Sequence, residues 1–266
     1  MTPAIEPAAS GCKHHPAIEE APRPACGCQG LLRPRRMHAL GGLWMACFLF
    51  AHLAIGVTGL SPRAYQRSTD FIHGVLARLP GITLIAIFIP LLGQMASGLY
   101  LLRKEGMKYN VKKCNRSGKL RFFLQRVTGL TILAFTLFHV GTLHAWGLHM
   151  VYRATHAAAL SRYAAGGLFQ AGGAAFRSTV EGFRSFCGSS AAGNWMVAVF
   201  CLLGTWAAAF HAANGAWSGA IVWSLAATPE SKRRWRRVSA AIGAVLLAIG
   251  TVAWYAFTLG DAARAF

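Results

Sequence analysis

Three histidines stand inside long apolar stretches of this sequence, where an ionisable side chain is costly. His52, His139 and His211 each lie deep in a segment with almost no charged neighbours. At bilayer depth such residues usually face the interior of a helix bundle and mark a functional site. Because a neutral imidazole nitrogen binds transition metals, pairs of these histidines are candidate axial ligands of a haem iron.

The depth of each histidine decides which of them can meet. His52 and His139 both lie about fourteen residues, or roughly 20 Å at 1.5 Å per residue, from the basic edge of their segments. Two imidazoles at matching depth on neighbouring helices suit a six-coordinate haem. His211 enters from the opposite face and lies in the other half of the membrane, at a depth comparable to that of Gln94. The alternative is that each imidazole hydrogen-bonds a backbone carbonyl within the bundle.

The elements that position these histidines are five apolar segments, each long enough to cross a hydrocarbon layer of about 30 Å. The chain has 266 residues, of which 55% are hydrophobic and only 13% charged, and its mean hydropathy is +0.41. We therefore predict an all-α polytopic membrane protein, a bundle of five transmembrane helices. The expected spans are residues 36–60, 82–102, 122–147, 194–225 and 238–258.

Two connecting segments have a different pattern. Phe71, Val75 and Leu79 recur at helical spacing after the first span, which predicts a helix lying in the membrane interface. A long connection of about residues 150–190 is rich in Ala and Gly and is expected to hold a short amphipathic helix.

The net charge of +19 comes from Lys and Arg gathered at the ends of the apolar segments. Clusters precede the first and fifth spans and fill the loop between the second and third, so five spans place all three on one side. The positive-inside rule makes that side the cytoplasm, with the N-terminus inside and the C-terminus outside. Membrane topology thus explains the charge without nucleic acid. No carboxylate lies within an apolar span, which disfavours a proton-coupled transporter.

Residues 1–34 form a polar extension that precedes the membrane domain of residues 35–266. Within about seventeen residues it gathers five potential metal ligands, Cys12, His14, His15, Cys26 and Cys28. Thiolates and imidazoles in this number could complete a tetrahedral zinc site or a Rieske-type [2Fe–2S] centre. Their spacing matches no standard zinc finger, and a disordered tail with incidental Cys and His is the alternative.

Four stretches, taken in order, resemble a known family. The sequence RRMHALGGLWMACFLFAHL resembles the first helix of the single-chain, five-helix cytochrome b anchor of succinate dehydrogenases and fumarate reductases. IPLLGQMASGLY resembles its second helix, FFLQRVTGLTILAFTLFHV its third, and FHAANGAWSGAIVW its fourth. The resemblance covers nearly all of the chain from Arg35 onward, and FLQRVTG and FHxxNGxWS are its most specific motifs.

The resemblance implies a multi-pass subunit of the cytoplasmic membrane that belongs to succinate dehydrogenase but does not itself bind succinate. In that family the anchor docks a flavoprotein subunit and an iron–sulfur subunit on its cytoplasmic face. Electrons pass between these subunits and a membrane quinone, for which menaquinone is the expected type although the residues leave it open.

Residue by residue, the resemblance assigns His52 and His139 to the outer haem b and His211 to an inner haem. The second inner ligand, a histidine in diheme members, is Gln94 here, and an amide is a poor ligand for haem iron. We hypothesise that a cluster bound by the N-terminal extension, with or without His211, replaces the inner haem. The expected quinone contacts are Arg36, His38, Gln125 and Arg126.

Two other classes of protein remain as alternatives. One is a cytochrome b electron carrier of another dehydrogenase, against which the FLQRVTG and FHxxNG motifs argue. The other is a haem-free membrane protein, either a transporter or structural protein or a variant anchor that uses an iron–sulfur centre. The matched depths of His52 and His139 argue against the absence of haem.

Overall fold

The computed structural model describes residues 33–79, 81–107, 116–143, 175–185 and 194–264, and these are helical with no strand among them. The long helices are α1 (Pro34–Val57), α3 (Ile89–Glu105), α4 (Arg116–Leu143), α8 (Asn194–Val222) and α9 (Pro229–Thr258). The shorter ones are α2 (Pro62–Arg78), α7 (Ala175–Ser185) and α10 (Asp261–Arg264). Five helical stretches are long and apolar enough to span a membrane, which confirms the predicted helical membrane fold.

The fifth helix starts much earlier than predicted, at Pro229 rather than near residue 238. Hydropathy marks only the part of a helix that lipid surrounds, so the predicted span began only after the basic run. That run is helical because Thr228 and Ser231 form a reciprocal capping box and Pro229 occupies the first turn.

Helices α8 and α9 pack closely through small residues. A Cβ added to Gly243 would lie 3.1 Å from Ala213, and one added to Gly250 would lie 2.5 Å from the side chain of Thr205. Ser239 donates to the carbonyl oxygen of Ala213 at 2.6 Å. Small side chains of this kind let membrane helices approach closely where no hydrophobic effect drives them together.

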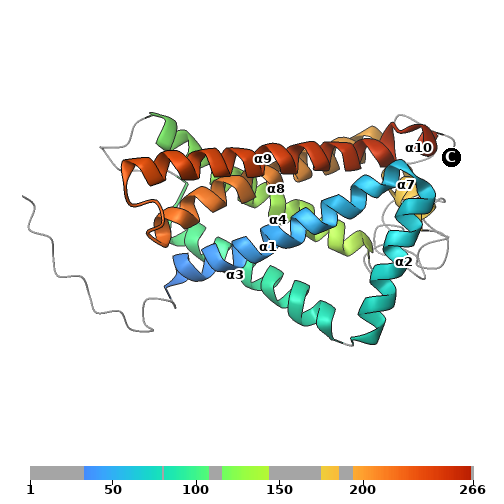
Figure 1. Ribbon diagram of the computed structural model, residues 1–266, viewed down its shortest axis with the longest axis horizontal. Helices are drawn as coiled ribbons and strands as arrows, with labels where there is room; N and C mark the ends of the chain where they lie inside the picture. The colour runs from blue at the N-terminus through green and yellow to red at the C-terminus, as the bar shows by residue number, and fades with distance from the viewer. Residues whose placement is uncertain (1–32, 80, 108–115, 144–174, 186–193, 265–266) are drawn as a thin grey trace, which may run out of the picture.

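Helix α3 carries a π-helical turn, Leu84–Phe88, at its start. Pro90 has no N–H to donate to the carbonyl oxygen of Ala86 one turn before it. Trp44 of α1 supplies a donor instead, with its indole Nε1 2.7 Å from that oxygen. The bond fastens the outer part of α3 to α1, although Figure 1 shows the two helices diverging toward α2.

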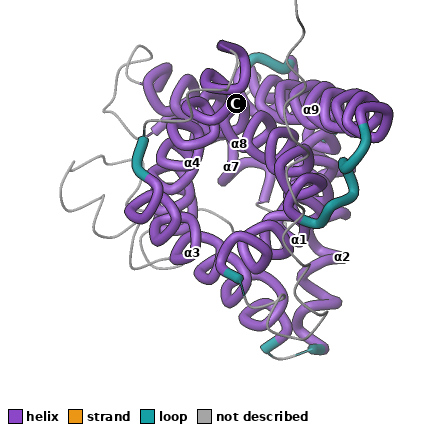
Figure 2. The backbone as a smooth tube through the Cα atoms, turned by 90° about the vertical axis from the view of Figure 1, so that its left-hand side faces the viewer, coloured by secondary structure: helices purple, strands orange, loops and turns teal. Residues whose placement is uncertain are grey.

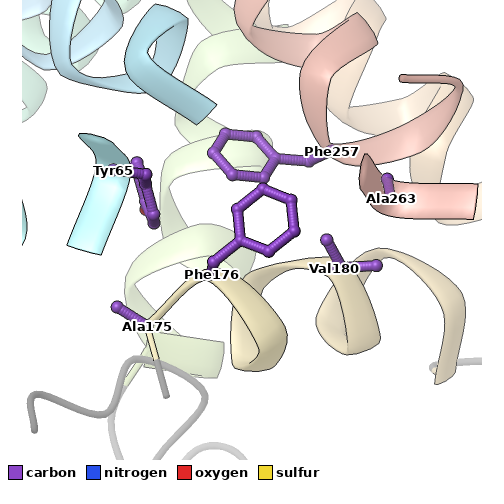
Figure 3. Packing of buried hydrophobic residues seen from close by; sticks show 6 residues of the cluster. All are labelled: Tyr65, Ala175, Phe176, Val180, Phe257 and Ala263. Atoms are coloured by element: carbon purple, nitrogen blue, oxygen red, sulfur yellow. The ribbon is translucent and has the colours of Figure 1, made fainter. Parts of the chain in front are cut away.

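An aromatic cluster lies where α2, α7 and the end of α9 meet, at the end of the bundle away from the start of α1 (Figure 1, Figure 3). Tyr65 of α2, Phe176 of α7 and Phe257 of α9 are buried against one another, with Ala175, Val180 and Ala263 around them. The tyrosine and Phe257 ring centroids lie 4.9 Å apart. This cluster anchors one face of α2 to the bundle, and α7 is the short amphipathic helix that was predicted.

The other face of α2 is apolar and exposed. Phe71 is 72% exposed, and Val75 and Leu79 are exposed beside it. This arrangement agrees with the predicted position of α2 in the membrane interface, where lipid covers such a face.

Most basic residues of the long helices lie at one end of the bundle, where α1, α4 and α9 begin and α3 and α8 end (Figure 1). The view in Figure 2 shows α3 and α4 on the side away from α9. The histidine-bearing helices α1, α4 and α8 extend between the basic end and the aromatic cluster, and α8 packs on both α1 and α4.

Candidate functional site

The rings of His52 and His139 face each other between α1 and α4. Their centroids lie 5.9 Å apart and their planes are inclined at 77°. Both helices run outward from the basic end, so residues far along each of them reach the same level. This is the encounter that the depth count predicts, while the binding of haem by the pair stays a prediction.

Each of these rings lies on a phenylalanine one helical turn before it. Phe48 stacks on His52 with centroids 5.6 Å apart, and Phe135 stacks on His139 at 5.5 Å. Behind Phe135, helix α8 carries the buried Gly204, where an added Cβ would lie 2.5 and 2.8 Å from two ring carbons. Only glycine leaves room there, so α8 indirectly sets the orientation of the His139 ring.

The spacing of the pair fits the axial ligands of a haem. A metal–imidazole bond is about 2 Å long and the ring centroid lies about 1.1 Å behind the ligating nitrogen, so two collinear axial imidazoles have centroids about 6.2 Å apart. The observed 5.9 Å is close to this value. No group of three or more His, Cys, Asp or Glu converges among the described residues. Two imidazoles are too few for a bare metal ion but sufficient for a haem iron.

His211 is held by the residues of the two sequence motifs, which meet between α4 and α8. The Oγ1 atom of Thr128 lies 3.2 Å from Nδ1 of His211, and a Cβ on Gly129 would lie 3.1 Å from the ring. Gln125 donates to the backbone oxygen of His211 at 3.3 Å and accepts from Asn214 at 2.8 Å. Residues of the FLQRVTG and FHxxNG motifs therefore hold His211 against α4.

His38 lies between α1 and α3, where it contacts Gln94 and Ser97. Its Nδ1 is 2.9 Å from Ser97 Oγ, and its Nε2 is 3.3 Å from the amide nitrogen of Gln94. The Gln94 amide lies flat on α1, because a Cβ on Gly41 would be 2.7 Å from its Oε1. That oxygen is buried and has no hydrogen-bond partner within the part of the chain that the structure describes. Gln94 is thus turned toward α1 and His38.

At the basic end, a single carboxylate ties three helices together. Glu105, the last residue of α3, accepts from Arg35 of α1 at 2.7 Å and from Arg126 of α4 at 2.8 Å. Arg126 also donates to the backbone oxygen of Gly106 at 2.6 Å. Sequence reasoning missed this contact, because Glu105 stands alone among basic residues in a segment that was expected to be a loop.

The four predicted quinone contacts have different partners. His38 and Arg126 bind the groups described above, and Gln125 points toward α8. The guanidinium of Arg36 lies over the ring of Trp223 at 5.4 Å. Sequence reasoning also missed Ser97 and Thr128, although Thr128 belongs to a motif that had been singled out. The N-terminal Cys and His residues lie outside the described residues.

Comparison with known proteins gives one informative match. No family model and no solved structure matches the chain. Over 225 residues it is 27% identical to the succinate dehydrogenase cytochrome b558 subunit of Bacillus subtilis (strain 168), a match that covers 84% of this chain and 95% of that protein. The predicted resemblance to succinate dehydrogenase cytochrome b anchors is confirmed by this relative.

Proposed function

We propose that this chain is the cytochrome b membrane anchor of a succinate:quinone oxidoreductase in the cytoplasmic membrane. The similarity to a succinate dehydrogenase cytochrome b subunit extends over most of both chains. Five helical stretches are long and apolar enough to cross a bilayer. The chain binds no succinate and acts as the part of the enzyme that carries electrons into the membrane.

The proposal rests on the His52–His139 pair, whose ring centroids lie 5.9 Å apart at one level of the bundle. A haem b bound there supplies a one-electron carrier within the hydrocarbon layer. His52 and His139 would supply the two imidazoles that hold this group, and Phe48 and Phe135 keep their rings oriented. The apolar walls of α1 and α4 exclude water from the group.

The quinone is proposed to bind at the basic end. Reduction places negative charge on a quinone oxygen, and cationic or amide donors stabilise that charge. Arg36, His38, Gln125 and Arg126 lie near this end and can supply such donors. By the positive-inside rule this end faces the cytoplasm, so the flavoprotein and iron–sulfur subunits are expected to dock on it.

The N-terminal extension is proposed to bind zinc or an iron–sulfur cluster. Changing Cys26 and Cys28 to Ser should lower the iron and acid-labile sulfide of the purified complex if a [2Fe–2S] centre is present, or its zinc if the site is tetrahedral zinc. Unchanged iron, sulfide and zinc would remove both forms of this proposal.

A spectrum and a co-purification test the proposed function together. The purified membrane complex should give a reduced-minus-oxidised b-type spectrum and contain a flavin-bearing, succinate-oxidising subunit. His52→Leu and His139→Leu should each reduce the haem content, whereas His73→Leu, on α2 and outside the bundle interior, serves as the matched control and should not. A complex that purifies with a different dehydrogenase would identify the chain as another cytochrome b, and a complex without haem would refute the ligand pair.

A further inference from the structure

The start of α9 carries more positive charge than the bundle neutralises. Its basic residues stand together in the sequence, with Glu230 as the one carboxylate near them, and they are Lys232, Arg233, Arg234, Arg236 and Arg237. All of these basic residues are exposed. Among the residues that the structure describes, none of them forms an ion pair, since the carboxylates in ion pairs there belong to Glu105 and Glu181.

Other arginines at the same end of the bundle already have polar partners. Glu105 binds both Arg35 and Arg126, and Arg121 donates to the side-chain oxygen of Asn214 at 3.0 Å. These contacts use up the charge of α3 and part of the charge of α1 and α4. The arginines of α9 are therefore the ones available to an anion from outside the chain.

Three of these arginines line a hollow on the surface of α9. The hollow has a volume of about 310 Å³ and is lined by Arg233, Arg236, Arg237 and Ala240. A second hollow, of about 580 Å³, lies farther along the helix and is lined by Trp206, Leu247, Ala248, Thr251 and Val252. Both volumes are in the range of about 300–1,000 Å³ that is typical of small-molecule sites.

The two hollows lie on the same side of α9. Arg233, Ala240 and Leu247 are spaced by seven residues, and each such step turns a straight helix by only about 20°. Between the hollows this side carries Ala244, which is exposed like Ala240. Small apolar side chains therefore form a shallow track from the arginines to the second hollow, on a helix that Figure 2 shows at the outside of the bundle.

Trp206 of α8 gives the second hollow a fixed apolar wall. Its indole Nε1 donates to Thr251 Oγ1 at 3.0 Å, and the Thr251 hydroxyl donates to the carbonyl oxygen of Leu247 at 2.7 Å. The polar atom of the indole is thus satisfied by α9, while the residue remains 42% exposed. Tryptophans of membrane proteins usually lie at the interface, and this bond holds Trp206 deeper in the bilayer.

The distance between the hollows matches one leaflet of a membrane. Leu247 and Val252 follow Val238, where the apolar part of α9 begins, by nine and fourteen residues. At 1.5 Å per residue they lie about 14 and 21 Å beyond it. Half of a hydrocarbon layer of about 30 Å is about 15 Å. The first hollow therefore lies at the level of the headgroups and the second near the middle of the bilayer.

We propose that this side of α9 binds one anionic phospholipid of the cytoplasmic leaflet. Its phosphate accepts hydrogen bonds from Arg233, Arg236 and Arg237, and one acyl chain lies along the alanine track and ends against Trp206. Basic pockets on the cytoplasmic side of membrane helices suit anionic headgroups in this way. The inference goes beyond the proposed function, because it does not depend on the dehydrogenase that the chain serves.

Two other occupants fit these features less well. A water-soluble subunit can contact the arginines but cannot reach a hollow in the middle of the bilayer. A second copy of the chain, packed through the same face, brings two sets of arginines together at one level, and opposed like charges disfavour that pairing. A lipid satisfies the charge at one end of the track and the apolar surface at the other.

The test measures lipid binding by the purified, delipidated complex. Dioleoylphosphatidylglycerol should raise the midpoint of thermal unfolding and appear in native mass spectra as one bound molecule per chain. Dioleoylphosphatidylcholine and inorganic phosphate should do neither. Arg233→Gln, Arg236→Gln and Arg237→Gln should weaken binding of phosphatidylglycerol by about fivefold for each guanidinium removed. Arg234→Gln, in the same basic segment but outside the hollow, is the matched control and should bind the lipid normally.

A substitution in the apolar hollow tests the path of the acyl chain. Ala248→Phe fills the second hollow and should weaken binding although every arginine remains, whereas Ala241→Phe, exposed but lining neither hollow, should not. Equal binding of phosphatidylcholine, equal stabilisation by inorganic phosphate, or equal effects of the two phenylalanine variants would overturn the inference. So would arginine variants that keep the lipid but release the iron–sulfur subunit or separate two copies of the chain.

Discussion

Replacing Gly204 with alanine should disturb the outer histidine pair without touching either histidine. The added Cβ would lie 2.5 and 2.8 Å from two ring carbons of Phe135, whereas ordinary contact begins at 3.4 Å. The ring must therefore move by about 1 Å, in a buried region where overpacking costs about 1–3 kcal/mol. Since Phe135 stacks on His139 at 5.5 Å, the imidazole loses the surface that orients it.

The assay compares Gly204→Ala with Gly141→Ala in the purified complex. Gly141 lies on α4 two residues beyond His139, and a Cβ added there meets nothing within 4 Å. Gly204→Ala should lower the midpoint of thermal unfolding and shift the midpoint potential or the low-temperature spectrum of the outer haem. Gly141→Ala should change neither quantity.

A second substitution, at Phe135, tests whether Gly204 acts through that ring. Phe135→Leu replaces the rigid ring with a side chain that can turn away from the new methyl group. The double variant Gly204→Ala/Phe135→Leu should therefore lose less stability than the sum of the two single variants, as expected for residues in contact. Additive losses, or equal effects of the two alanine substitutions, would show that Gly204 does not act through Phe135.

Three further predictions follow from contacts elsewhere in the bundle. Glu105→Gln removes the charge that bridges two arginines, one of them only 12% exposed, and should cost about 1.5–3 kcal/mol of stability. As a control, Glu181→Gln breaks the ion pair with the exposed Arg177 and should cost much less in the same thermal assay. Trp44→Phe leaves the carbonyl oxygen of Ala86 without its indole donor and should cost about 1–3 kcal/mol, and an unchanged unfolding midpoint would contradict this. Burial raises the pKa of Tyr65. The stability contributed by its neutral hydroxyl is therefore complete below the unfolded pKa of about 10 and is lost as the pH rises through the folded pKa. Tyr65→Phe should reduce this alkaline loss of stability, which a pH series of unfolding midpoints would measure.

The level of each histidine could be predicted from the sequence, because the rise of a helix is fixed and the basic residues mark its starting edge. That is why the His52–His139 encounter followed from counting residues. The positions of the spans followed from hydropathy, because the part of a helix that lipid surrounds is apolar. Hydropathy could not reveal that α9 begins at Pro229, because the first turns of that helix lie beyond the apolar part.

The direction in which a side chain points around its helix could not be predicted in the same way. Gln94 and His211 have comparable depth in the sequence, yet Gln94 turns toward His38 because Gly41 leaves space for its amide. That choice depends on the rotation of α1 and α3 relative to each other. Glu105 reaches arginines of two other helices through its side chain, which depends on tertiary packing that residue spacing does not encode.

The polar strip between α4 and α8 constrains the order of events during synthesis. Arg121 and Gln125 of α4 find hydrogen-bond partners in Asn214 of α8, a helix that the ribosome makes much later. A polar group without a partner in hydrocarbon costs several kcal/mol. We therefore expect the third span to stay beside the insertion machinery or close to the headgroups until the fourth emerges, so that the two enter the lipid as a pair.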